Sequence, residues 1–188
     1  MPCCLLVPNV YSVMRNLTFF FLLACPLLAQ TRFDGTWEMK MDTLQFSGTP
    51  EDYMIVNGVY QCRSCVPPVD VRTDGKDHKV AGHEMYYDTI AVRVLDDHSV
   101  EFTFKKEGKP VARSKEIVSA NGKTMLEVFQ NVGGKEAVTG KAGFLRVGAA
   151  SPGAHALSGK WQMRSIRNNT QAGTLTTYRS IPNGFARR

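Results

Sequence analysis

The chain has 188 residues, of which 43% are hydrophobic and 10% aromatic, and its formal net charge is +6. This composition is typical of a folded protein with room for one domain or a little more, and it excludes a largely disordered chain. The basic residues are interleaved with acidic ones, as in Lys105-Lys106-Glu107, so we expect no nucleic-acid partner.

Residues 1–29 have the features of a secretory signal peptide. A charged start at Met14-Arg15 precedes an apolar run, and the small residue Ala29 offers a cleavage point. Met14 is therefore a better start of translation than Met1. The run is interrupted by Pro26 and is short for a membrane span. We expect a secreted or periplasmic protein.

The leader also contains Leu22-Leu23-Ala24-Cys25, which resembles a bacterial lipobox. The alternative is therefore a lipoprotein anchored through Cys25, and we expect a membrane partner only in that case.

The segment from residue 33 to residue 88 has the pattern of β-strands. Trp37 and Met39 alternate with charged residues, Asn57-Gly58 divides residues 53–62 into two strands, and Val69-Asp70-Val71-Arg72 reads as a further strand.

The segment from Thr89 to Gln130 predicts an antiparallel meander of four strands. Its three connections, near Asp97, Gly108 and Asn121, are rich in turn-forming residues. We found no sustained 3.6-residue apolar period in the mature chain and expect little helix. Seven to nine short strands favour a sandwich or a barrel. Alternation along the strands places four apolar side chains in the interior: Val92, Val94, Phe102 and Phe104.

Two cysteines, Cys62 and Cys65, remain once the leader is removed. In an oxidising compartment such a pair most simply forms a disulfide. Their close spacing requires a turn at Arg63-Ser64, because residues three apart in a straight strand are too distant to be bridged.

A zinc site is the alternative for these cysteines. Cys62, Cys65, His78 and His83 have the spacing C-x2-C-x12-H-x4-H, which supplies four tetrahedral ligands. Gly82 lies between the histidines, where a zinc finger needs a helix. We therefore assign no metal to the chain, and free thiols are the third interpretation.

One short motif occurs twice. Gly35-Thr36-Trp37 returns as Gly159-Lys160-Trp161 after a stretch, residues 148–156, composed like a flexible linker. We interpret residues 30–147 as one complete β domain and residues 157–188 as the truncated start of a second copy.

The G-x-W motif ahead of an antiparallel meander resembles the opening of the lipocalin-like, or calycin, β-barrels of exported bacterial proteins. Asp74-Gly75-Lys76-Asp77 and Val118–Met125 are similar to phrases of the same proteins. The resemblance implies an all-β, antiparallel barrel or half-open barrel with Trp37 packed against one end. It also implies a central cavity for a small apolar ligand, lined by the four interior residues named above.

Three classes of function remain open. The first is an exported, non-enzymatic ligand-binding or interaction domain, and the second is a structural β module displayed at the surface. The third is a calycin-like enzyme with an acid/base site near His83 and Asp88, within a titratable cluster that also holds Glu84, Tyr86 and Tyr87. Because we found no nucleophile elbow or phosphate-binding loop, we assign no catalytic residue and no cofactor. The sequence does not indicate an oligomeric state.

Overall fold

The computed structural model describes residues 33–187 except 47, 150–151, 171–173 and 183. The predicted signal peptide and Cys25 lie outside these residues. The chain divides into two compact units, Glu38–Leu175 and a smaller unit made of the two ends of the chain. In the described part of the chain, no helix has the length and apolar character to cross a membrane.

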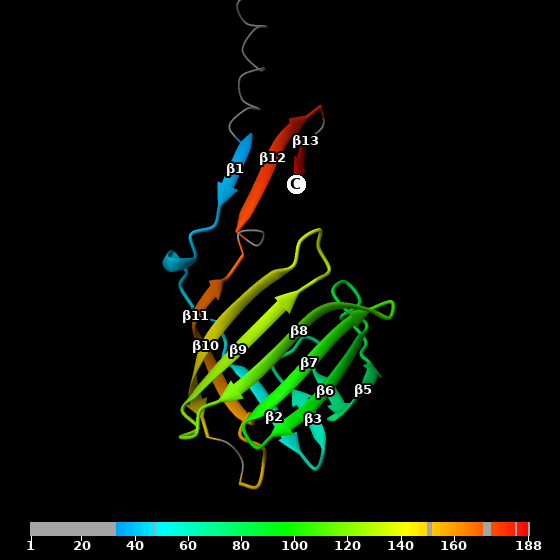
Figure 1. Ribbon diagram of the computed structural model, residues 1–188, viewed down its shortest axis with the longest axis vertical. Helices are drawn as coiled ribbons and strands as arrows, with labels where there is room; N and C mark the ends of the chain where they lie inside the picture. The colour runs from blue at the N-terminus through cyan, green and yellow to red at the C-terminus, as the bar shows by residue number, and fades with distance from the viewer. Residues whose placement is uncertain (1–32, 47, 150–151, 171–173, 183, 188) are drawn as a thin grey trace, which may run out of the picture. The chain divides into compact units, whose positions relative to one another are not determined.

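The larger unit is built on one antiparallel sheet (Figure 1). A single 3-10 turn, η1 (Met41–Thr43), precedes it. The order of its strands across the sheet is β4 (Val69–Arg72), β3 (Val59–Cys62), β2 (Glu51–Val56), β11 (Gly159–Asn168), β10 (Val138–Gly148), β9 (Thr124–Asn131), β8 (Lys109–Val118), β7 (Ser99–Lys106), β6 (Thr89–Asp96) and β5 (Asp74–Lys79).

The sheet curls into a nearly closed barrel. Its two edge strands, β4 and β5, follow one another in the chain with only Thr73 between them, so the edges of the sheet are brought together. Figure 1 shows β5 to β9 side by side, with β2 and β3 across the interior from them. The predicted antiparallel all-β meander is confirmed.

Local turn chemistry sets the register of the hairpins. Asn57-Gly58 and Glu107-Gly108 all have positive φ angles, between 51° and 76°, as a two-residue turn between twisted antiparallel strands requires. Glycine adopts such angles without a steric penalty. The turns predicted near Asp97, Gly108 and Asn121 lie between β6 and β7, β7 and β8, and β8 and β9.

Alternating side chains fill one end of the barrel. Val92 and Val100 are fully buried, and Phe102 nearly so, whereas the residues between them are more exposed. Such alternation is the consequence of the two-residue period of a strand with one dry face. At the end of β8 nearest Ser119, the core is completed by Leu157 and Trp161.

Trp161 is the tryptophan that closes the barrel, and the prediction that Trp37 does so is corrected. Trp161 is 0% exposed, its Nε1 donates to the Leu157 carbonyl at 2.8 Å, and the Arg146 guanidinium lies 4.1 Å from its ring centroid. Trp37 is 51% exposed. The physical reason is strand pairing. Trp161 lies on β11, which pairs with both β10 and β2, so the Trp161 side chain enters the core.

The glycine of the buried motif is required by a close approach. Gly159 has a φ of 128°, and a Cβ there would lie 2.5 Å from Arg146 Nη1 and 3.1 Å from the Gly148 carbonyl oxygen. At Gly35, in the first copy of the motif, a Cβ would meet nothing within 4 Å. Close packing therefore requires a glycine at position 159, but not at position 35.

The structure divides the chain differently from the predicted boundary at residue 147. Residues 157–168, which we assigned to a second copy, supply the strand that joins β10 to β2 within the first barrel. Ser158 strengthens this junction, since its hydroxyl accepts from the Ile55 amide at 2.8 Å. That residues 157–188 arose as a second copy stays a prediction.

The smaller unit is a three-stranded sheet in the order β1 (Gly35–Glu38), β12 (Leu175–Ile181) and β13 (Gly184–Arg187). Asp34 accepts hydrogen bonds from the Ser180 amide and hydroxyl, and Phe33 packs edge-on against Phe185. The sheet thus combines the first G-x-W strand with the last two strands of the chain.

Candidate ligand-binding cavity

A cavity of about 280 Å³ lies inside the barrel, at the end opposite to Trp161. Phe104, Ala112 and Asn131 line it and are register partners near the β7–β8 turn. Trp161 is instead the register partner of Arg146 on β10. The Arg146 amide donates to the Lys123 carbonyl beside the β8–β9 turn, which lies at the other end of β8. The barrel therefore has one packed end and one hollow end.

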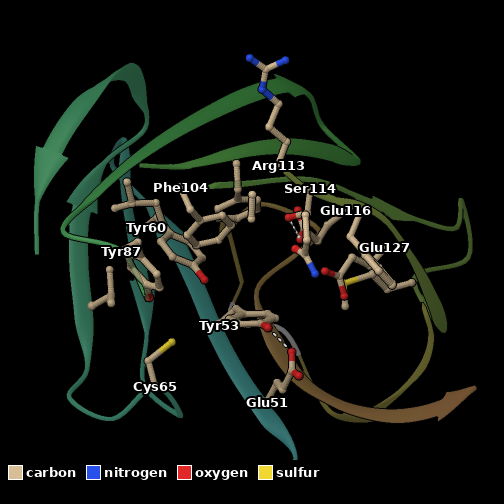
Figure 2. A pocket seen from close by; sticks show the side chains of 17 residues that line it. Glu51, Tyr53, Tyr60, Cys65, Tyr87, Phe104, Arg113, Ser114, Glu116 and Glu127 are labelled. Carbon is tan, nitrogen blue, oxygen red and sulfur yellow. Dashed lines mark hydrogen bonds between the residues drawn. The ribbon is translucent and has the colours of Figure 1, made fainter. Parts of the chain in front are cut away.

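One wall of the cavity is aromatic (Figure 2). Tyr60 packs edge-on against Phe102 and Tyr87 against Phe104, both with ring centroids 5.0 Å apart. Edge-to-face packing at this distance fixes the orientation of each ring. The aromatic residues of the lining come from β2, β3, β7, β9 and the segment before β6: Tyr53, Tyr60, Tyr87, Phe102, Phe104 and Phe129.

The facing wall carries carboxyl groups. Glu116 on β8 and Glu127 on β9 are direct register partners, and both line the cavity together with Glu51. Ser114 Oγ donates to Glu116 Oε1 at 2.8 Å, and the Tyr53 hydroxyl donates to Glu51 Oε2. Figure 2 shows Glu116 and Glu127 side by side, across the cavity from the aromatic wall.

One oxygen on this wall has no partner. Among the buried side-chain atoms of the described residues, Glu116 Oε2 makes no hydrogen bond, although Glu116 is only 9% exposed. A buried polar atom without a partner costs free energy, and so do two carboxyl groups directly opposite on neighbouring strands. Both destabilising features occur at Glu116.

Burial shifts the acid/base behaviour of these groups. The pKa of Glu116 is raised well above its usual value, by burial first and by Glu127 second. Burial, with a contribution from Glu51, raises the pKa of Glu127 to about 7. Burial also raises the pKa of Glu51, with the Tyr53 hydrogen bond opposing it. At neutral pH Glu127 is thus close to the midpoint between its two protonation states.

Among the lining residues only Arg113 is cationic, and it does not balance the carboxyl groups. Its side chain is exposed and points away from the cavity (Figure 2). Arg113 follows the inward-facing Ala112 on β8 and precedes the buried Ser114, so alternation directs it outward.

The structure separates the four residues predicted to line a ligand cavity into two pairs. Phe102 and Phe104 lie in its lining, whereas Val92 and Val94 belong to the packed core and its margin. A role of any of them in binding stays a prediction.

The acidic wall was not among the predicted site residues. The signal was present in the parity of β8: Val118 is buried, so Glu116 and Ser114 share its inward face, and Ile117 points outward at 37% exposure.

Cys62 and Cys65 form a disulfide, with Cα atoms 5.4 Å apart. Disulfide sulfurs are not thiolate ligands. His78 bonds to Asp74 at 2.8 Å and His83 to the Pro67 carbonyl at 2.9 Å. Within the described ranges, we find no group of three or more acidic, histidine or cysteine side chains arranged to hold a metal ion.

The titratable cluster considered for an enzyme is spread over different surroundings. His83 is buried and stacks on Tyr87, with centroids 5.1 Å apart, behind the aromatic wall. Glu84 and Asp88 instead line a surface groove, and Tyr86 is exposed. The hydrogen bond from the Glu107 amide keeps the pKa of Asp88 below its usual value.

No family model, curated protein or solved structure matches the chain. The nearly closed antiparallel barrel is consistent with a lipocalin-like fold, and the G-x-W motif remains the sequence feature behind that likeness.

Proposed function

We propose that this protein is an exported, non-enzymatic barrel of lipocalin-like type that binds a small molecule in its interior. The observation that carries the proposal is the hollow end of the barrel, a cavity of about 280 Å³ lined by residues of seven strands. Small-molecule sites are concave, mostly apolar, and contain a few polar groups that fix the orientation of the ligand. Aromatic rings and three glutamates give this cavity that composition.

The cavity favours a small ligand. Benzene occupies an apolar cavity of about 150 Å³. By that scale a cavity of about 280 Å³ accepts roughly ten non-hydrogen atoms. A single-ring compound with a short side chain fits this size.

Export is supported by the signal-like leader and by the disulfide between Cys62 and Cys65, a bond that persists in oxidising compartments. The enzymatic alternative receives less support, because His83 packs behind the cavity wall while Asp88 lines a surface groove elsewhere. A reaction needs its acid and base within reach of one substrate.

Thermal denaturation in the presence of a library of single-ring compounds tests the proposal. A ligand at a hundred times its dissociation constant adds about 2.7 kcal/mol to the free energy of unfolding, so a hit raises the midpoint by several degrees. Ala112→Phe fills the cavity with a ring and should abolish the shift. Ala91→Phe is the matched control, because Ala91 lies between the buried Ile90 and Val92 and faces outward.

If no compound raises the midpoint, the binding function is refuted. A hit that Ala112→Phe leaves unchanged would place the ligand elsewhere and would also refute it.

A further inference from the structure

The acidic wall is the feature that a purely apolar ligand leaves unexplained. Glu116 and Glu127 are adjacent register partners on the neighbouring strands β8 and β9, and Glu51 lines the same cavity. Protonation removes the charge repulsion but leaves Glu116 Oε2 without a partner, because a carboxylic O–H needs an acceptor as much as a carboxylate needs a donor. No donor of the described residues bonds to this oxygen, so a donor from a bound ligand would complete the wall.

The nature of that donor follows from the charges. Three carboxyl groups converge on a space whose one cationic lining residue, Arg113, points away from it. A bound cation would satisfy the free oxygen and offset the repulsion between Glu116 and Glu127. Hydrogen bonds between an ammonium group and a carboxylate are also among the strongest that proteins make.

The opposite wall indicates an organic cation rather than a metal ion. Tyr60, Tyr87 and Phe104 offer ring surfaces and no metal-ligating group suited to a hard cation. Aromatic faces attract ammonium groups and pack against apolar rings. Moreover, the three glutamates do not form a metal-binding group in the described structure.

We propose that the cavity binds a small organic amine, with its ammonium group between Glu116, Glu127 and Glu51 and its apolar or aromatic body against Tyr60, Tyr87 and Phe104. This inference rests on the proposed function and adds the chemical class of the ligand. The raised pKa of Glu127, about 7, is consistent with it, because a bound cation would draw the proton from that carboxyl group.

Three probes of nearly equal size and shape separate charge from fit. They are 2-phenylethylamine, a cation at neutral pH; 2-phenylethanol, which is neutral; and phenylacetate, an anion. Their dissociation constants are measured by isothermal titration calorimetry on the purified full chain at pH 8. We expect the amine to bind at least tenfold more tightly than the alcohol and the anion to bind least tightly.

Glu116→Gln tests the acidic wall directly, since the amide keeps the shape and removes the charge. We expect it to weaken amine binding at least tenfold and to leave alcohol binding unchanged. Glu101→Gln is the control, because Glu101 lies on the adjacent strand β7, faces outward and pairs with Arg93. It should change neither affinity. Glu127→Gln serves as the second variant if Glu116→Gln does not fold.

The outcomes distinguish the two proposals. The amine inference is overturned if the amine and the alcohol bind equally well, or if Glu116→Gln and Glu127→Gln both leave amine binding unchanged. A ligand-binding barrel then remains. If none of the three probes binds while other compounds raise the thermal midpoint, the amine inference also falls and the proposed function stands. Failure of both the probes and the compound library refutes both.

Discussion

Replacing the buried tryptophan should destabilise the barrel far more than replacing its exposed counterpart. Trp161 and Trp37 occupy the same position of a repeated motif, yet their exposures are 0% and 51%. Trp161→Ala and Trp37→Ala therefore form a matched pair in which the residue type and the local sequence are held nearly constant.

The magnitude follows from the surroundings of Trp161. Removing a fully buried tryptophan costs about 3–5 kcal/mol, including the cavity left behind. This range already includes the loss of the indole's hydrogen bond to the Leu157 carbonyl and of its contact with the Arg146 guanidinium, each worth about 1 kcal/mol. We expect a total loss of about 4 kcal/mol for Trp161→Ala, and less than about 1 kcal/mol for Trp37→Ala.

Urea denaturation followed by far-ultraviolet circular dichroism is the suitable assay, since tryptophan fluorescence is altered by both substitutions. With a slope of about 2 kcal/mol/M, Trp161→Ala should lower the urea midpoint by about 2 M, and Trp37→Ala should barely move it. Equal midpoints for the two variants would refute the assignment of β11 to the barrel. A larger fall for Trp37→Ala would restore the original prediction that Trp37 closes the end.

Two further predictions concern the disulfide and the buried acids. The bond between Cys62 and Cys65 closes a very short loop, so the double Cys→Ser variant should lose only about 2 kcal/mol in a urea titration; no loss would mean that the bond does not constrain the unfolded chain. The pKa of Glu127 is raised from 4.5 to about 7, so the folded state retains a proton that the unfolded state has released. Stability should therefore fall by up to about 3 kcal/mol as the pH rises from 4.5 to 7, and Glu127→Gln should flatten this part of the profile. Stability that rises over this interval in the parent protein would contradict the buried position of Glu127.

The strands and turns of the barrel could be predicted from the sequence because their determinants are local. Asn57-Gly58 and Glu107-Gly108 set their hairpins through the backbone angles that these residues accept. Phe102 and Phe104 face inward because alternation within one strand decides it.

Two features could not be predicted because they depend on which distant strands pair. The Trp37 and Trp161 motifs are almost identical locally, and only the pairing of β11 with β10 and β2 buries the second one. Glu116 and Glu127 become partners only through the register of β8 with β9. Charged residues in a strand ordinarily indicate the wet face, and here the cavity reverses that rule.

The place of β11 in the barrel also has a consequence for how the chain folds. Ile55 and Ser158 meet across the junction between β2 and β11 although they are 103 residues apart in the sequence. During synthesis, β2 leaves the ribosome long before β11 and exposes a row of unpaired amide and carbonyl groups. Contacts of such high sequence separation form slowly, because the entropy of closing the long loop is lost before the contacts are gained. We therefore expect a folding stage in which the edge of β2 is unpaired and prone to aggregation, until pairing with β11 covers it.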